Sequence, residues 1–263
     1  MRKIWTVDAF TSKAYAGNPA AVMIVDEFPQ DMALIAMEMN LSETVFLKPL
    51  GENHFHIRWF TPAVEIKLCG HATLAASHIL FQENKINGQT IHYESLSGPL
   101  TVDKLSDGLV LNFPLQKTTD ILDKTIYAQA LNLSEEIIEV VKAYDDVIVL
   151  VNHEDVVKNL VVNVNKLAEI HVRGVIITAT SQQYDFISRF FGVDCGVHED
   201  PVTGSAHCKL ADFWSKRLNK TEFHAYQASK RGGELNIKIE QDRVLIKGQA
   251  VTIMEGQWMI AAP

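Results

Sequence analysis

The sequence lacks the short motifs that mark nucleotide-binding and metal-binding proteins. Its 263 residues contain neither a Gly-x-Gly-x-x-Gly pattern nor a phosphate-loop lysine motif. The ten histidines form no His-Glu-x-x-His or comparable cluster. We therefore expect no bound nucleotide and no metal ion.

Basic surfaces, long apolar runs and cysteines are also scarce. Lys and Arg number 24 against 32 Asp and Glu, a formal net charge of −8, and no basic stripe interleaved with aromatic residues occurs. This balance argues against a nucleic-acid partner. No apolar run approaches the roughly 18 residues that a membrane helix requires, and residues 1–8 lack the apolar core of a signal peptide. Cys69, Cys195 and Cys208 are odd in number and have no metal-like spacing. We expect a cytoplasmic protein that contacts no membrane.

Two similar segments, far apart in the sequence, stand out against these absences. Leu68–Thr73 and His198–Ala206 each place a glycine and small polar residues directly before an apolar helical run. The start of a helix offers unpaired backbone N–H groups and a positive dipole end, which together suit an anion. We therefore expect a carboxylate-bearing ligand at these helix starts.

The similarity extends beyond the two glycines. Arg58-Trp59-Phe60 precedes Gly70, and Arg189-Phe190-Phe191 precedes Gly204. The arginines are 131 residues apart and the glycines 134, each about half of the chain. The spacing predicts a weak two-fold internal repeat, folded as two similar lobes that face each other across the ligand.

The pattern of apolar residues predicts many short strands and few helices. Helices are expected near 30–39, 72–80, 126–131 and 206–214, with a further helix opening at Ser134. Strands are expected near 4–10, 20–25, 42–47, 54–60, 91–93, 98–102, 109–113, 147–151, 160–164, 174–179, 235–239, 244–246, 248–253 and 258–260. This mixture is typical of an α+β protein and not of a βαβ nucleotide-binding fold.

A polar segment divides the sequence. Residues 114–123 contain two threonines and one lysine and are the best candidate for a crossing between lobes. We expect an N-terminal lobe over residues 1–116, joined by the terminal strand at about 250–263, and a C-terminal lobe over 117–249.

Glu43 is a lone acid in the otherwise apolar run Leu41–Leu47. A carboxylate partly withdrawn from water gains proton affinity, which suits it to take and return a proton near neutral pH. The alternative is an outward-facing acid on a half-buried strand.

The two helix starts supply further candidates. His71 follows Gly70, where the helix dipole disfavours the charged imidazole and keeps the ring neutral. Asp200 precedes Pro201, which pushes Asp200 toward extended backbone and aims its carboxylate at the next helix start. The alternative is that Glu199 or Asp200 merely caps that helix, as Thr203 or Ser205 also could.

Cys69 and Cys208 adjoin the helix starts, where a thiolate would be stabilised. A facing pair of cysteines would suit a two-base racemase. The positions are not equivalent, however, because Cys69 precedes its glycine and Cys208 follows four residues after its own. Cys208 is expected on a packed helix face as an inert thiol.

Several segments together resemble the phenazine biosynthesis-like (PhzF-like) isomerase family, which shares the fold of diaminopimelate epimerase. They run in the family's order along essentially the whole chain, and the string Glu-Asp-Pro-Val-Thr-Gly-Ser-Ala is highly specific. The matching segments are 7–10, 17–22, 42–46, 58–62, 68–75, 199–206 and 227–233.

The resemblance implies two pseudo-symmetric lobes, each a mixed β-sheet rolled around a central helix, with the active site in the cleft between them. It implies that Glu43 is the acid/base that moves a proton between carbons of one small carboxylic acid, assisted by His71 and Asp200. Gly70, Gly204 and Ser205 would contact the substrate carboxylate. The family's members are cofactor-free and commonly homodimers.

The sequence is also compatible with two other functions. One is an amino-acid racemase or epimerase that uses Cys69 with a partner across the cleft. The other is a non-catalytic protein that keeps the cleft for ligand or protein binding, because fold does not fix function.

Overall fold

The computed structural model describes residues 2–192 and 197–260. The chain folds as two compact units, Met1–Phe113 with Ile246–Pro263 (unit 1) and Pro114–Leu245 (unit 2). The boundaries expected from the sequence, at 116 and 249, lie three and four residues later. Cys195 lies outside the described residues.

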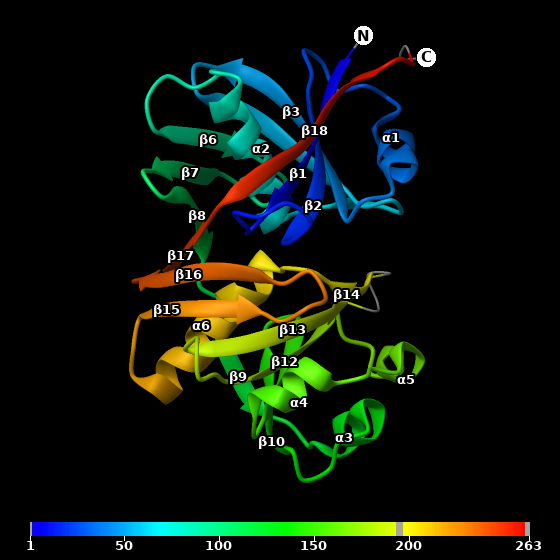
Figure 1. The fold of residues 1–263 in the computed structure, drawn as a ribbon, viewed down its shortest axis with the longest axis vertical. Helices are drawn as coiled ribbons and strands as arrows, with labels where there is room; N and C mark the ends of the chain where they lie inside the picture. Colours follow the sequence, from blue (N-terminus) through cyan, green and yellow to red (C-terminus); the bar gives the residue numbers. More distant parts are fainter. Residues whose placement is uncertain (1, 193–196, 261–263) are drawn as a thin grey trace. The chain divides into compact units, whose positions relative to one another are not determined.

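Unit 1 is built from strands around one buried helix (Figure 1). Its elements, in chain order, are β1 (Arg2–Ala9), β2 (Asn18–Ile24), α1 (Met32–Met39), β3 (Glu43–Gly51), β4 (His54–Phe60), β5 (Glu65–Ile66), α2 (Gly70–Gln82), β6 (Thr90–Glu94), β7 (Leu100–Leu105), β8 (Gly108–Pro114) and β18 (Ala250–Trp258).

Unit 2 repeats this plan with an extra pair of short helices. Its elements are β9 (Thr118–Ile121), α3 (Thr125–Leu131), β10 (Ile137–Ala143), β11 (Asp146–Val151), α4 (Glu154–Asn159), α5 (Val164–Ala168), β12 (Gly174–Thr180), β13 (Phe186–Gly192), β14 (Val197–Asp200), α6 (Gly204–Leu218), β15 (Glu222–Gln227) and β16 (Gly233–Glu240). Strand β17 (Arg243–Gly248) continues from unit 2 into unit 1.

Strand pairing is the same in the two units, element for element. β2 and β3 are parallel across α1, and β11 and β12 are parallel across α4 and α5. β4 and β6 are parallel across α2, as β13 and β15 are across α6. The remaining corresponding pairs, such as β3–β4 and β12–β13, are antiparallel. The predicted α+β fold of two pseudo-symmetric lobes is confirmed.

The central helices are buried for different reasons. In α2, which is largely made of small and apolar side chains, every residue from Gly70 to Ser77 is buried, and the helix contacts β1, β2, β3 and β18. In α6 the buried run from Ala206 to Trp214 also contains charged side chains, and Lys209 and Asp212 form ion pairs there.

Unit 1 takes one strand, β18, from the far end of the sequence, whereas unit 2 is continuous. β9 follows β8 of unit 1 but pairs with β10 of unit 2. β18 follows β17 and pairs with β1 of unit 1 over all of Arg2–Ala9. The segment 114–123, expected as a polar crossing, therefore contains a strand.

Four of the predicted elements differ in the structure. Residues 134–136 form a turn and not a helix start, because Glu136 Oε2 accepts the Ser134 N–H bond at 2.8 Å and β10 begins directly after it. The strand expected at 160–164 is absent, because Asn163 caps α5 through the N–H groups of Asn165 and Lys166. In place of the two strands expected at 248–253 and 258–260 there is one strand, β18 (Ala250–Trp258), which carries an irregularity opposite Thr6 and Val7.

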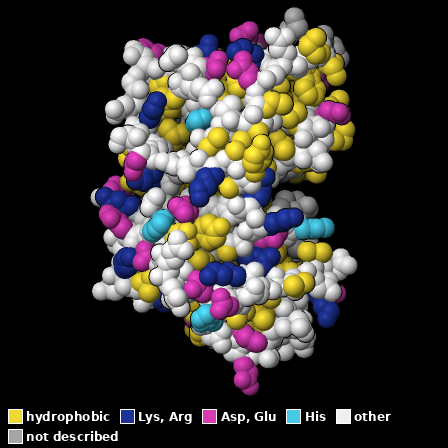
Figure 2. All heavy atoms as spheres, in the orientation of Figure 1, with side chains coloured by type: hydrophobic (Ala, Val, Ile, Leu, Met, Phe, Trp, Pro, Cys, Tyr) yellow, Lys and Arg dark blue, Asp and Glu magenta, His cyan; other side chains and the backbone are white. Residues whose placement is uncertain are grey.

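On the face drawn in Figure 2, Lys and Arg side chains are interspersed with Asp and Glu side chains, and apolar side chains gather over parts of unit 1. No helix of the described chain is both long and apolar enough to cross a membrane.

Candidate active site

Glu43 and His71 meet inside unit 1. The Glu43 carboxylate oxygen Oε2 lies 2.8 Å from His71 Nε2. The two groups are not aligned as a good hydrogen bond requires, so this contact is an ion-pair contact at short distance. Glu43 is 8% exposed and His71 2% exposed. The alternative of an outward-facing Glu43 is therefore wrong.

The local fold explains why these two side chains converge. Glu43 is the first residue of β3, which pairs in parallel with β2 so that Glu43 lies opposite Ala20. His71 is the second residue of α2, whose N-cap, Cys69, has extended backbone and no capping side-chain bond. The start of a parallel strand and the start of the helix thus bring an acid and an imidazole together.

Two further side chains contact the other ring nitrogen of His71. Asn18 Nδ2, at the start of β2, lies 3.0 Å from His71 Nδ1. Cys69 Sγ lies 3.5 Å from the same nitrogen. Asn18 is fully buried and Cys69 is 7% exposed. The imidazole is therefore held between Glu43 on its Nε2 side and Asn18 with Cys69 on its Nδ1 side.

The charges around His71 overturn the expectation of an uncharged ring. Burial lowers the pKa of His71, but adjacent Cys69 and Glu43 outweigh burial and raise this pKa well above its ordinary value. The contribution of Glu43 is the one that persists at neutral pH, since Cys69 is then a thiol. A carboxylate at 2.8 Å outweighs the dipole of the helix start, which acts only as a partial charge.

Cys69 does not have the properties of a catalytic thiolate. Burial, followed by the Glu43 charge, raises the pKa of the Cys69 thiol to about 11, in spite of the opposing contacts with His71. The thiol thus keeps its proton at neutral pH. The expected thiolate stabilisation at this helix start is overturned, which weighs against the racemase that uses Cys69.

Glu43, Cys69 and His71 are also the only group of three in the described chain whose ligand atoms lie within 4.8 Å of one another. Glu43 lies beside Nε2 of the imidazole, whereas Cys69 lies beside Nδ1, so the two side chains flank different ring nitrogens. The absence of a metal ion stays a prediction from the sequence.

In unit 2, Asp200 lies before the start of α6 within a small hydrogen-bonded group. Thr203 Oγ1 donates to Asp200 Oδ2 at 2.5 Å, and the buried Gln227 Nε2 donates to the Asp200 backbone oxygen at 2.7 Å. Thr203 occupies the N-cap of α6 without a capping side-chain bond. Glu199 instead forms a two-pronged pair with Arg189 at 2.6 and 2.9 Å. Neither acid acts as the helix cap.

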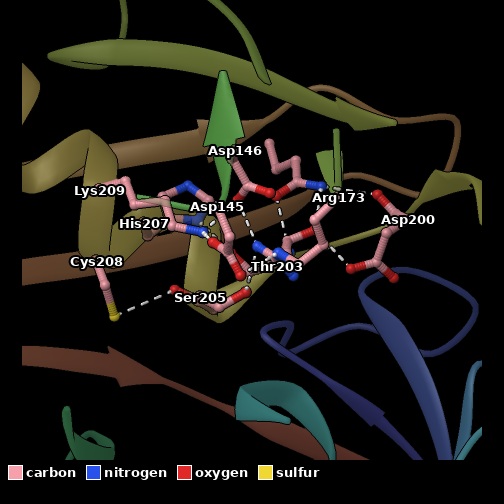
Figure 3. Close-up of polar contacts among 11 residues, drawn as sticks. Asp145, Asp146, Arg173, Asp200, Thr203, Ser205, His207, Cys208 and Lys209 are labelled. Carbon is pink, nitrogen blue, oxygen red and sulfur yellow. Dashed lines mark hydrogen bonds and ion pairs between the residues drawn. The ribbon is translucent and has the colours of Figure 1, made fainter. Parts of the chain in front are cut away.

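A second polar group lies behind the start of α6 (Figure 3). Lys209, which is 1% exposed, contacts Asp145 at 2.5 Å and also Asp146. Arg173 contacts Asp146 and Asp145, and its Nη2 lies 3.4 Å from Ser205 Oγ. Burial raises the pKa of Asp146 although both cations oppose it, whereas for Asp145 the same cations outweigh burial and lower its pKa.

Cys208 is a packed, inert residue of α6, as the sequence predicts. It is 3% exposed, and its thiol donates to the Gly204 backbone oxygen at 3.7 Å. Burial raises the pKa of the Cys208 thiol to about 12. With Cys69 also protonated, a mechanism with two thiols loses both of its bases.

The predicted residues fall into two sets, one in each unit. Glu43, His71 and Gly70 lie together in unit 1, and Asp200, Gly204 and Ser205 lie around the start of α6 in unit 2. Three side chains that contact these residues were not predicted as site residues, namely Asn18, Arg173 and Gln227. The ion-pair group of Asp145, Asp146 and Lys209 beside Arg173 was not predicted either. One signal was present: Asn18, Asp146 and Arg173 are polar residues directly at the entrance of a buried strand.

Solved structures with the same fold define the class of this protein. A PhzF-family phenazine biosynthesis protein from Enterococcus faecalis superposes with a TM-score of 0.92 at 38% identity, covering 98% of this chain and 99% of that one. A predicted epimerase from Pseudomonas aeruginosa superposes with a TM-score of 0.81 at 19% identity, covering 99% and 100%. The epimerase likeness shows the fold alone, and it agrees with the predicted diaminopimelate epimerase-like architecture.

Sequence relatives give the family. The model of the family described as phenazine biosynthesis-like protein matches residues 7–256. An uncharacterized isomerase from Halalkalibacterium halodurans is 44% identical over 264 residues, covering 98% of each chain. The chain belongs to the phenazine biosynthesis-like family, and its enzyme class is isomerase.

Proposed function

We propose that this enzyme moves a proton between carbons of a small carboxylic acid, with Glu43 as the single acid/base and His71 as its partner. The observation that carries the proposal is the contact of 2.8 Å between two side chains that are almost entirely buried. A buried carboxylate has few competing water molecules, so it can hold a proton between its removal from one carbon and its return to another.

The reaction divides into two steps with no net oxidation or reduction. The Glu43 carboxylate takes a proton from one substrate carbon, so a C–H bond breaks and an O–H bond forms. The substrate carboxyl or a conjugated double bond delocalises the electron pair that is left behind. Glu43 then gives the same proton to another carbon on the same face. His71, 2.8 Å from the carboxylate, positions Glu43 for both steps.

Substrate binding follows from the helix starts. A carboxylate is favoured where a helix begins, because N–H groups and the dipole point at it. We propose that Gly70 in unit 1, and Gly204 with Ser205 in unit 2, contact the substrate carboxylate, and that Asp200 assists in the same reaction. We also propose a homodimer, which sedimentation analysis of the purified protein tests directly.

The test uses a panel of small unsaturated and amino-substituted carboxylic acids incubated with the enzyme in D₂O and followed by proton NMR. We expect one class of acid to isomerise, and its migrating hydrogen to stay largely within the molecule in a single turnover. Glu43→Gln should remove turnover by roughly 10³-fold or more while the acid still binds. The exposed Glu52→Gln serves as the matched control and should leave turnover unchanged.

Two results would contradict the proposal. One is undiminished turnover in Glu43→Gln, which would remove Glu43 from the reaction. The other is a product whose new C–H hydrogen comes entirely from solvent in a single turnover, which would exclude one base that keeps its proton.

A further inference from the structure

Asn18 is a buried polar residue beside the Glu43–His71 pair that has no role in the proposed reaction. Its side chain is fully buried, and its Nδ2 lies 3.0 Å from His71 Nδ1. An imidazole that is neutral carries one proton, on either Nδ1 or Nε2, and the neighbour of one nitrogen decides where that proton sits. The role of Asn18 therefore depends on which group it presents to the ring.

The backbone before Asn18 is fixed by a close approach. Gly17 has φ +65°, and a Cβ at this position would lie 2.1 Å from the Ala9 backbone oxygen. Asn18 then enters β2, where it pairs with Ala9 of β1, and Pro19 restricts its backbone further. The turn leaves Asn18 little freedom to move away from His71.

The groups that face Nδ1 carry hydrogens. Asn18 presents its amide nitrogen, a donor, and Cys69 presents a thiol, since the pKa of that thiol is about 11. Nδ1 must then be the acceptor, with its lone pair free of a proton. On the other side, Nε2 faces the Glu43 carboxylate. When this group is ionised it has no hydrogen to donate and can only accept a hydrogen bond.

We propose that Asn18 is a positioning residue that holds the proton of neutral His71 on Nε2, where it faces Glu43. The ring then donates toward the ionised carboxylate of the base. Asn18 also opposes a second proton on Nδ1, because its amide would have to turn its oxygen toward the ring. Asn18 thereby acts against the Glu43 charge, which favours the doubly protonated ring.

Of the titratable groups on the elements packed against the ring, Glu43 on β3 and Cys69 at the start of α2 are the ones that contact it in the described structure. Asn18 on β2 completes the surroundings without a charge of its own. A substitution of Asn18 by Asp tests the proposal directly, since it keeps the shape of the side chain and replaces the donor by an acceptor with a negative charge.

The test measures the proton positions themselves in protein labelled with ¹⁵N at histidine. Long-range proton–nitrogen correlation spectra distinguish a protonated from an unprotonated ring nitrogen. At a pH above the raised pKa of His71, where the ring is neutral, we expect Nε2 to be protonated and Nδ1 to be bare in the unaltered protein. In Asn18→Asp we expect Nδ1 to be protonated and the titration midpoint of His71 to rise by about one pH unit or more. In Asn18→Ala the midpoint should rise less.

His78 provides an internal control in the same spectra. It lies two turns further along α2, and its Nε2 contacts Thr252 Oγ1 at 3.0 Å. Its titration should be the same in all three proteins. The proposal is overturned if neutral His71 carries its proton on Nδ1, or if Asn18→Asp leaves the titration of His71 unchanged.

The benefit of this arrangement to catalysis rests on the proposed function of Glu43, but the position of the proton does not. If the ring shows the expected protonation and no acid is turned over, the inference holds and the proposed function fails. If turnover requires Glu43 but neutral His71 is protonated on Nδ1, the proposed function holds and the inference about Asn18 fails. Where turnover is found, Asn18→Ala should lower kcat more than it changes KM, with a shifted pH profile.

Discussion

Arg173 Nη2 lies 3.4 Å from Ser205 Oγ, and this contact in unit 2 occupies the same place in the fold as the contact of Glu43 with His71 in unit 1. Ser205 and His71 are each the second residue of a central helix. Glu43 begins the second strand of a parallel pair, and Arg173 directly precedes the corresponding strand. The internal repeat thus keeps the geometry and changes the chemistry, with an acid in one unit and a cation in the other.

Gly17→Ala should disrupt the site through the backbone alone. The new Cβ would meet the Ala9 oxygen, and φ of +65° strains any L side chain. We expect a loss of about 2 kcal/mol or more in the free energy of unfolding, measured by denaturant titration. Gly51→Ala is the control, because a Cβ there meets nothing within 4 Å. Equal stability of the two variants would show that the turn does not need a glycine.

Cys69 and Cys208 should resist thiol reagents while the protein is folded. Their thiols have pKa values of about 11 and about 12, mainly because of burial, so very little thiolate exists at about pH 8. The measurement follows iodoacetamide labelling in a Cys195→Ser background. Unfolding in guanidinium should allow Cys69 and Cys208 to react with the reagent. Rapid labelling of Cys69 in the folded protein would support a thiol mechanism. Cys69→Ala should retain turnover.

Lys209→Met should destabilise unit 2 strongly. The substitution leaves Asp146, which is 1% exposed, with Arg173 as its remaining cationic partner. Loss of one partner of a buried ion pair costs about 3 kcal/mol or more. Adding Asp146→Asn should recover part of this loss in a double-variant comparison of unfolding free energies.

A substitution of the half-exposed Lys238, Lys238→Met, is the control. It should leave the free energy of unfolding nearly unchanged, because water screens the ion pairs of Lys238. Strictly additive effects of the two substitutions would show that Lys209 and Asp146 are not coupled.

His207 should make the protein less stable as the pH falls. Burial lowers the pKa of His207 to about 4, although its contact with the Thr203 oxygen opposes this. Between about pH 6.5 and 4 the unfolded chain binds a proton that the folded chain does not, so stability declines as the pH falls through this range. The total loss in the free energy of unfolding across this pH range is about 3 kcal/mol. His207→Gln should flatten the dependence of the unfolding midpoint on pH, and an unchanged slope would argue against a neutral buried ring.

Much of the fold follows from local patterns, and the exceptions have local causes. The central helices were predictable because a glycine precedes a long apolar run in each. The strand expected at 160–164 was not formed because a single side chain, Asn163, caps a short helix there. The segment 114–123 gave no strand signal, since β9 is short and largely exposed and is held by pairing with a distant strand, β10.

For the site, the sequence identified the reactive groups better than their charge states. Glu43 and His71 were predictable from motif and position, but the charge on His71 depends on a carboxylate that is close only in the folded chain. Lys209 and Asp146 were missed because a buried ion pair leaves no local pattern when its members lie 63 residues apart. Asn18 lies within one of the family-like segments, yet its role becomes visible only through the contact with His71 Nδ1.

The pairing of β18 with β1 has a consequence for how the protein is made. β1 pairs with β2 early in synthesis, but its other partner, β18, leaves the ribosome much later. Unit 2 ends at Leu245 and has emerged before β18, whereas unit 1 until then has one edge of β1 uncovered. A message truncated shortly before residue 250 would therefore release a chain whose amino-terminal half is the incomplete one.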